Sequence, residues 1–482
     1  MVRIIKGVND MEKKLPSFIS SIIIFIFMVV GMSSSVFIFD IPIHITLLAV
    51  TAFAVAILLI EGFKWEDIIS SIEDAGKLAL PPLLILYVIG ALIGTWIASG
   101  TVPIIIYWGL KLIHPSLFLF TTCLVCSVVS IATGSSWSTA GTVGVALMGV
   151  GGGLGINPAM TAGAIISGAY LGDKMSPMSD TTNLAPAVAE ADLFDHIKSM
   201  FYTTTPGFII ALAVYVILGI NHSGNVNTES INSILVAIKQ NYSLNIITLI
   251  PPLIVILFAI KKVPSLITLV IATIVAALIA IFMQDESITT ITSIMDSGYV
   301  SNIGLPEIDS LLSRGGFQSM NWTCSLAMLG ITLGTILEKL GVLEVLLSKI
   351  IRFTKTVGGL VCSTVLSVIA LNMITASQYT SIVIGGRMFV SEYKKKDMLP
   401  QTLSRTLEDS GTITSPLVPW NTCGVFMAGT LGVSTLSYAP YAVLCWVVPI
   451  ISIIFGFTNK FQWKTGEIQS KKVYEKVEQI LD

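Results

Sequence analysis

Charge is scarce in this sequence of 482 residues. Only 12% of them are Asp, Glu, Lys or Arg, about half the share of an average soluble protein. From Leu112 to Gly172 there is no such residue at all. Hydrophobic residues make up 54% of the chain and the mean hydropathy is +0.85. The composition therefore excludes a soluble globular domain and predicts a polytopic membrane protein embedded in a lipid bilayer.

Several functional signals are also missing. The sequence has no basic stripe for nucleic acid, so nucleic-acid partners are excluded. The string "GVGGGLG" (149–155) lacks the Lys-Ser/Thr of a phosphate loop. Of six scattered cysteines, only Cys123 and Cys126 form a CxxC, and they lie in the apolar run "FLFTTCLVCSVV" near a single His114. We interpret this pair as packing residues and expect no cofactor.

Long apolar segments are abundant. A membrane helix needs about 20 apolar residues, and uninterrupted candidates are 18–38, 41–62, 78–98, 204–220, 244–260, 263–283, 319–338, 357–375 and 437–457. Gly, Pro and polar clusters interrupt five others, at 100–116, 117–153, 158–195, 376–393 and 402–435. Such breaks occur at membrane depth only where the backbone is buried or lines a wet cavity. The sequence thus predicts an all-α fold with roughly 11–13 membrane segments, including discontinuous helices and re-entrant hairpins.

The chain divides into two similar halves. "SSIEDAG" (70–76) matches "TSIMDSG" (292–298), and "MSP" (175–177) is placed like "TSP" (414–416). We expect a cytoplasmic N-terminal segment (1–17), a first membrane repeat (18–220), an extracytoplasmic linker (221–242), a second repeat (243–457) and a helical cytoplasmic C-terminal tail (458–482).

The charge of the loops indicates that the two repeats are inverted. Cytoplasmic loops are rich in Lys and Arg. The loop at 38–42 has neither, whereas its counterpart holds Lys261 and Lys262. Conversely, Lys64 and Lys77 flank a loop whose counterpart, 284–317, has one Arg against five acids. Because the bias reverses between the halves, we predict inverted-topology repeats, the architecture of secondary transporters whose site lies at the repeat interface.

The segment "GDKMSPMSDTTNLAP" (172–186) follows the uncharged run directly. Pro177 has no N–H, so the carbonyl of Asp173 loses its helical partner, and Gly172 allows the chain to open before that acid. The sequence predicts a broken helix whose oxygens surround a dehydrated Na⁺. The candidate ligands for Na⁺ or H⁺ are Asp173, Ser176, Asp180, Thr181, Thr182 and Asn183, with Na⁺ assigned to Asp173 and Asp180. A cytoplasmic loop is the alternative, and Lys174 is either a countercharge or a snorkelling residue.

The second half has a matching break in "TLEDSGTITSPLVPWNTCG" (406–424). Pro416 frees the carbonyl of Thr412, and Pro419 that of Ser415. Here we expect the ion- and proton-binding candidates Glu408, Asp409, Ser415, Asn421 and Thr422 to line the same cavity from the opposite side. In the alternative, the acids lie at the membrane edge beside Arg405. Two hydroxyl-rich hairpins add candidates for an ion or substrate site, unless they only join helices: Ser135, Ser136, Thr139, Ser377, Gln378 and Thr380.

The stretch "GAYLGDKMSPMSDTTNLAP" (168–186) closely resembles the signature of the NhaC family of sodium/proton antiporters. The similarity extends from about residue 20 to 457. The resemblance implies a bacterial inner-membrane transporter, not an enzyme, that exchanges cytoplasmic Na⁺ for external H⁺ by alternating access, often as a homodimer. Since the family includes malate/sodium-lactate antiporters and relatives described as amino-acid carriers, a Na⁺- or H⁺-coupled carrier of a small organic anion or amino acid is the alternative. An intramembrane aspartyl protease is disfavoured, because Tyr170 stands where its Gly-x-Gly-Asp motif has the first glycine.

Overall fold

The computed structural model describes residues 14–39, 41–112, 114–222, 228–261, 263–350 and 355–464. Two expected parts lie largely outside these ranges, namely the N-terminal segment up to residue 13 and the tail from residue 465 onward. Within them the chain is almost entirely helical, as the sequence predicts. Among the described residues, one bridge joins two extended residues, Met398 and Lys464.

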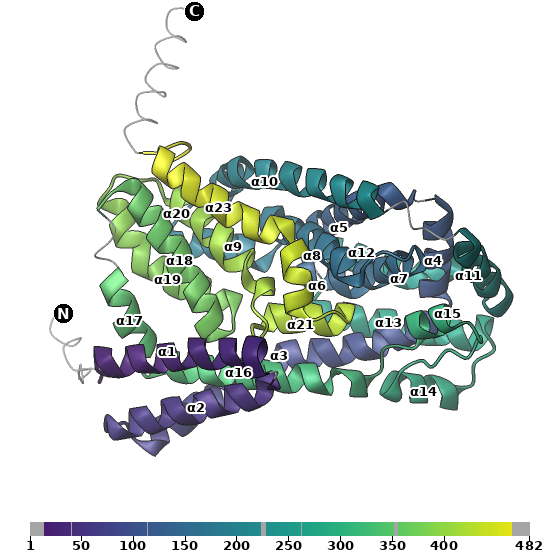
Figure 1. The fold of residues 1–482 in the computed structure, drawn as a ribbon, viewed down its shortest axis with the longest axis horizontal. Helices are drawn as coiled ribbons and strands as arrows, with labels where there is room; N and C mark the ends of the chain where they lie inside the picture. Colours follow the sequence, from purple (N-terminus) through teal and green to yellow (C-terminus); the bar gives the residue numbers. More distant parts are fainter. Residues whose placement is uncertain are drawn as a thin grey trace, which may run out of the picture.

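One group of long helices forms a layer along one side of the molecule, seen at the bottom of Figure 1. Helix α3 is its centre and packs on α13, α14 and α16, while α1 and α2 pack on each other and on α17 and α16. The bounds of these helices are α1 Phe18–Ser34, α2 Ile43–Ile60, α3 Trp65–Ala98, α13 Ser265–Met283, α14 Ile288–Ser297, α16 Asn321–Lys339 and α17 Val342–Ile350.

The second group lies above this layer and contains four of the five interrupted segments, all except 100–116 (Figure 1). Its closest pair is α5 with α8, and α18, α19, α20 and α9 pack on one another beside α10 and α23. The bounds are α5 Phe118–Thr133, α6 Ser136–Thr139, α7 Val145–Gly153, α8 Pro158–Met175, α9 Asp180–Ala189, α10 Leu193–His222, α18 Val357–Thr375, α19 Gln378–Lys394, α20 Pro400–Leu407, α21 Thr422–Leu431, α22 Thr435–Tyr438 and α23 Val443–Thr458.

Four further helices lie at the right-hand end of the molecule in Figure 1 or between the two groups. They are α4 Thr101–Leu112, α11 Thr228–Asn241, α12 Ile250–Ile260 and α15 Pro306–Leu312. Helix α4 packs on α7 and α11, and α12 packs on both α13 and α5. The two groups are therefore in contact through α12 as well as through α16, which touches α18 and α21.

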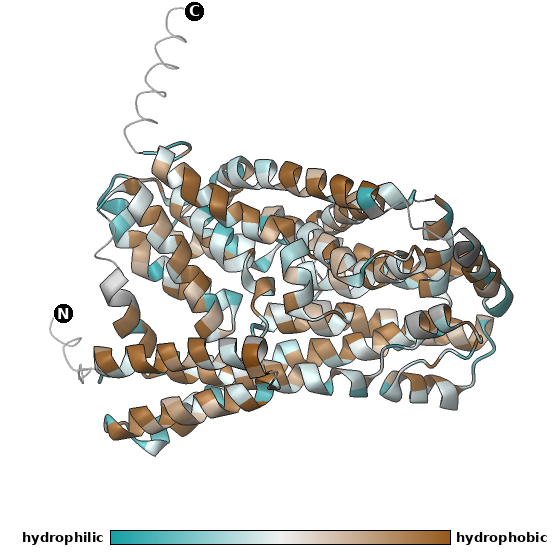
Figure 2. Cartoon of the chain, in the orientation of Figure 1, coloured by the Kyte–Doolittle hydropathy of each residue, from teal (hydrophilic) through white to brown (hydrophobic). Residues whose placement is uncertain are grey.

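Apolar side chains cover the outside of the long helices. Figure 2 shows hydrophobic residues along α1, α2 and α10, with hydrophilic residues concentrated at helix ends and loops. Large apolar side chains such as Ile19, Val30, Ile60 and Phe282 are exposed. Exposed apolar surface of this extent on long helices is the surface that lipid covers.

Among the described residues, seven helices are long and apolar enough to cross a membrane, or up to nine if each bent pair of helices forms one span. The sequence predicts 11–13 membrane segments. The numbers differ because the interrupted segments fold as short or polar helices. Helix α8 has 18 residues but includes Asp173 and Lys174. By contrast, Pro81 and Pro82 lie inside α3 and leave it a continuous helix.

Candidate functional site

The predicted break after Asp173 is present. Helix α8 ends at Met175, Ser176 adopts an extended backbone, and α9 begins at Asp180. The carbonyl of Asp173 does not stay free, because Thr182 Oγ1 donates to it at 2.8 Å and to the Lys174 carbonyl at 2.9 Å. One hydroxyl from α9 thus replaces the two missing helical donors and joins the two halves of the broken helix.

Gly172 has a different role from the predicted one. It is helical, so the chain does not open there. Instead, a Cβ at Gly172 would lie 2.3 Å from backbone atoms of Ser130 and Ile131. Gly172 therefore allows α8 to approach α5 closely, and the helix opens only where Pro177 removes its donor.

The carboxylate of Asp173 is held by two serines. Ser136 Oγ donates to it at 2.5 Å and Ser179 Oγ at 2.6 Å. Ser136 lies in the first turn of α6, which begins after the left-handed residue Gly134 and is capped by Ser135. The break in α8 and the first hairpin, which are separate in sequence, thus meet at one carboxylate.

The second half builds a similar hairpin. Helix α18 ends at the left-handed residue Ala376, and Ser377 caps α19 by accepting from the N–H of Thr380. Gln378 follows directly, and its Oε1 accepts a hydrogen bond of 3.1 Å from Ser415 Oγ. Ser415 Oγ also lies 2.7 Å from the carbonyl of Thr412, the group that Pro416 leaves without a partner.

Asn372 holds the second break together, and the sequence analysis missed it. Its amide nitrogen donates to the carbonyl of Gly411 at 2.6 Å and to Thr414 Oγ1 at 3.1 Å. Its carbonyl oxygen Oδ1 accepts from Ser381 Oγ, and its backbone carbonyl accepts from Asn421. The available signal was the single amide side chain within the apolar span 357–375.

A cavity of about 790 Å³ brings the two hairpins together. Of the predicted site residues, eight line it: Ser135, Ser136, Asp173, Asp180, Ser377, Gln378, Thr380 and Thr422. Besides these two aspartates, Glu338 is the one further acid on the wall. No Lys, Arg or His is among the lining residues. The wall therefore favours a cation over an anion.

The remaining predicted residues lie behind this wall or support it. Ser176, Thr181, Thr182, Ser415 and Asn421 are buried, and Thr139 donates to the carbonyl of Ser135 within its own helix. Asn183 is exposed and donates to the carbonyls of Pro177 and Ser179. None of them lines the cavity. All but Thr181, whose hydroxyl contacts that of Ser179, hold the breaks by hydrogen bonds to the backbone.

Glu408 and Asp409 are also placed behind the wall, not on it as the sequence analysis expects. Both are fully buried in a π-helical turn, Glu408–Thr412, which continues α20. Lys174, itself fully buried, donates to Asp409 Oδ1. Thr203 Oγ1 donates to the same oxygen at 2.9 Å, and Arg405 Nε lies 3.8 Å from Oδ2. Lys174 is thus a countercharge, and it draws Asp409 inward because a buried charge needs a partner.

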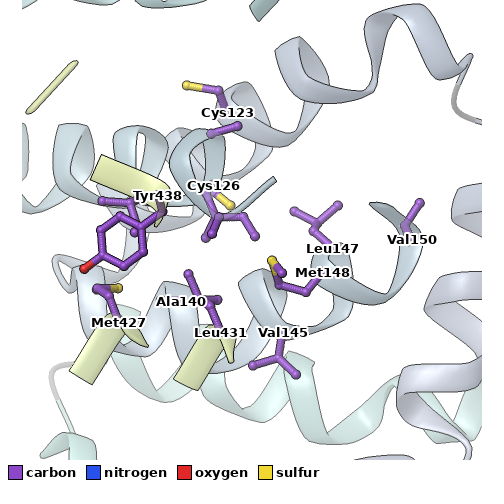
Figure 3. Close-up of a cluster of buried hydrophobic side chains, with 14 of the residues drawn as sticks. Cys123, Cys126, Ala140, Val145, Leu147, Met148, Val150, Met427, Leu431 and Tyr438 are labelled. Carbon is purple, nitrogen blue, oxygen red and sulfur yellow. The ribbon is translucent and has the colours of Figure 1, made fainter. Parts of the chain in front are cut away.

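The two cysteines of the CxxC are free and buried. Figure 3 shows Cys123 and Cys126 among apolar side chains that include Leu147, Met148 and Tyr438. Among the described residues, no group of three or more His, Cys, Asp or Glu side chains is arranged to hold a metal ion.

Comparison with known proteins places this architecture in a family. A model of the Na⁺/H⁺ antiporter family matches residues 11–182 and 168–460. The chain belongs to the Na⁺/H⁺ antiporter family. It is 38% identical to the Na⁺/H⁺ antiporter NhaC of Alkalihalophilus pseudofirmus, over 91% of this chain and 95% of that protein.

Other relatives have names that refer to organic cargo. The chain is 36% identical to the malate-2H⁺/Na⁺-lactate antiporter of Bacillus subtilis, over 96% of this chain and 99% of that protein. It is 39% identical to the arginine/ornithine antiporter ArcD of Halobacterium salinarum, over 84% and 83%. Family membership thus identifies the chain as a multi-pass membrane transporter. Because the relatives are named for different cargo, the cargo of this chain is argued from its site.

Proposed function

We propose that the chain is a Na⁺/H⁺ antiporter of the bacterial plasma membrane that exports cytoplasmic Na⁺ in exchange for H⁺. The observation that carries the proposal is the Asp173 carboxylate on the wall of the cavity, with Ser136 and Ser179 within 2.6 Å. Hydroxyl and carboxylate oxygens are the ligands a dehydrated alkali cation requires at a broken helix. The same hydroxyls turn their hydrogens to the carboxylate when no cation is bound.

The position of the cavity supports binding of Na⁺ from the cytoplasm. Its wall includes Leu78 of α3 and Val263 beside α13. Leu78 follows Lys77 in the same helix, and Val263 lies two residues after Lys261, and the charge bias assigns both lysines to the cytoplasmic side. We therefore infer an inward-facing state with both chain termini in the cytoplasm.

An amino acid with a cationic side chain is the second candidate cargo. The cavity of about 790 Å³ is much larger than an ion, and its acids suit a positive charge. A small organic anion fits less well, because the lining residues include no cationic side chain.

Flux measurements in proteoliposomes test the function. With no organic solute present, an outwardly directed Na⁺ gradient should acidify the lumen, reported by a trapped pH dye. Asp173→Asn should abolish this signal. Glu190→Gln, at an exposed ion pair with Lys394, is the matched control and should leave it unchanged. A signal that appears only when arginine or another amino acid is added would transfer the proposal to the second candidate.

A further inference from the structure

Glu408 is a buried acid without a hydrogen-bond partner. Neither of its carboxylate oxygens has one among the described residues, and the Thr412 hydroxyl in the same turn has none either. The hydroxyls of Thr412 and Thr181 are the nearest potential donors to its carboxylate, although neither makes a hydrogen bond of ordinary geometry with it, and Lys174 and Asp173 are its charged neighbours. A buried ionised carboxylate without donors is strongly disfavoured, whereas a protonated one is tolerated.

The adjacent acid has the opposite surroundings. Asp409 is engaged by Lys174, Thr203 and Arg405, so its negative charge is compensated in the resting structure. Two neighbouring acids in one turn of the chain therefore have different surroundings: the charge of Asp409 is compensated, whereas the carboxylate of Glu408 accepts no hydrogen bond.

Six acidic or basic side chains are buried among the described residues, and they form one cluster: Asp173, Lys174, His196, Arg405, Glu408 and Asp409. His196 lies near Lys174 and Arg405, its Nδ1 contacts Ser404 and its Nε2 has no acceptor, so it is counted as neutral. Two tyrosines, Tyr170 and Tyr393, are the other buried titratable groups nearby.

We propose that Glu408 carries the proton that is exchanged for Na⁺, at a site separate from the Asp173 carboxylate and the two serines that hold it. This inference rests on the proposed function. On the outward-facing side, a proton from water forms an O–H bond with a carboxylate oxygen of Glu408. On the cytoplasmic side that bond breaks, the proton returns to water, and Na⁺ binds beside Asp173.

The charge of the cluster explains why the two ions alternate. Among the buried residues, Lys174 and Arg405 balance two of the three carboxylates, so one negative charge remains; Asp180 is exposed on the cavity wall and is outside this count. Either a Na⁺ beside Asp173 or a proton on Glu408 cancels it. With both bound the cluster has one excess positive charge, and with neither it has one excess negative charge. Because uncompensated charge in a low-dielectric interior is costly, only the singly loaded states are suited to cross the membrane.

The same count argues against Glu408 as a second Na⁺ ligand site. A cation there together with one at Asp173 would leave an excess positive charge. Glu408 is also absent from the cavity wall, where Asp173 and Asp180 are found. A proton needs only one oxygen, whereas Na⁺ would need several more ligands than the two nearby threonines supply.

Sodium binding measured against pH tests the proposal. Purified protein in detergent is heated with and without NaCl, and the stabilisation by Na⁺ gives the affinity. In the wild type, affinity should fall as the pH falls, by up to tenfold per pH unit, since a proton on Glu408 opposes Na⁺. Glu408→Gln should bind Na⁺ with one weak affinity at every pH, equal to that of the wild type at its acid limit. It should also lose Na⁺-driven proton movement in proteoliposomes.

Each alternative result contradicts a different step. A wild-type pH dependence in Glu408→Gln would place the exchanged proton on another group. No sodium stabilisation of Glu408→Gln, at a pH where the wild type still responds, would make Glu408 a Na⁺ ligand. Failure of the proposed function is distinguishable, because then Asp173→Asn would bind Na⁺ as the wild type does. If Glu408→Gln does not give a monodisperse protein, Glu408→Asp replaces it, and its pH dependence should be retained but displaced.

Discussion

The buried pair of Lys174 and Asp409 allows a quantitative prediction. Asp409→Asn keeps the shape of the side chain and an oxygen that accepts from Thr203, but it removes the charge that compensates Lys174 and partly Arg405. Both cations are fully buried, so no water replaces the lost partner. Removing one member of a buried ion pair costs about 3–5 kcal/mol.

An exposed pair in the same protein provides the reference. Lys394 and Glu190 are 2.8 Å apart but are 57% and 62% exposed. Such pairs contribute about 1 kcal/mol or less. Asp409→Asn should therefore lower the apparent melting temperature by several degrees, and Glu190→Gln by much less. The assay is size-exclusion chromatography of detergent-solubilised protein after heating.

A double variant separates the cost of the unpaired charge from the loss of the contact. Lys174→Met combined with Asp409→Asn removes both charges of the pair, so it should recover part of the stability lost by Asp409→Asn alone. If Asp409→Asn is no less stable than Glu190→Gln, the two residues are not a coupled buried pair. The same holds if the stability lost by the double variant equals the losses of Lys174→Met and Asp409→Asn added together.

Two further predictions follow from the charge count and from the loop charges. Because the cluster is neutral in both loaded forms, exchange should be one Na⁺ for one H⁺. A potassium diffusion potential set with valinomycin should therefore not change the exchange rate. A rate that follows the potential would contradict the charge count. The loop charges predict the labelling of two exposed positions in a cysteine-free background. Gly152→Cys should be labelled from the external side and Lys395→Cys from the cytoplasmic side. Labelling of both from one side would refute the inverted repeats.

The sequence predicts the break in α8 well, since one proline has a local and specific effect. Pro177 removes a donor, and the helix ends just before it. Prolines alone do not decide the outcome, because Pro81 and Pro82 sit within a continuous α3. What differs is the polar context, as the α8 break is filled by Ser176, Ser179 and Thr182, whose hydroxyls satisfy the freed backbone.

Long-range pairing could not be predicted from the sequence. Lys174 and Asp409 are 235 residues apart in the chain, and no local pattern states that they meet. The contacts of Asn372 with Gly411 and Asn421 depend in the same way on how the second hairpin packs. The sequence does identify the correct chemical groups, because charged and amide side chains in apolar spans are rare, but only the packing of the helices assigns their partners.

The two halves share a local construction but not the same charge. In each, a helix ends at a left-handed residue, Gly134 or Ala376, and a serine caps the next helix. Asp173 precedes Pro177 by the same interval as Thr412 precedes Pro416. The position that holds the cavity carboxylate in one half thus holds a hydroxyl in the other. A repeat-symmetric pair of Na⁺ sites is therefore not built, and the remaining acid, Glu408, lies beside Thr412 on the buried side. This asymmetry is what assigns one cation to one half and one proton to the other.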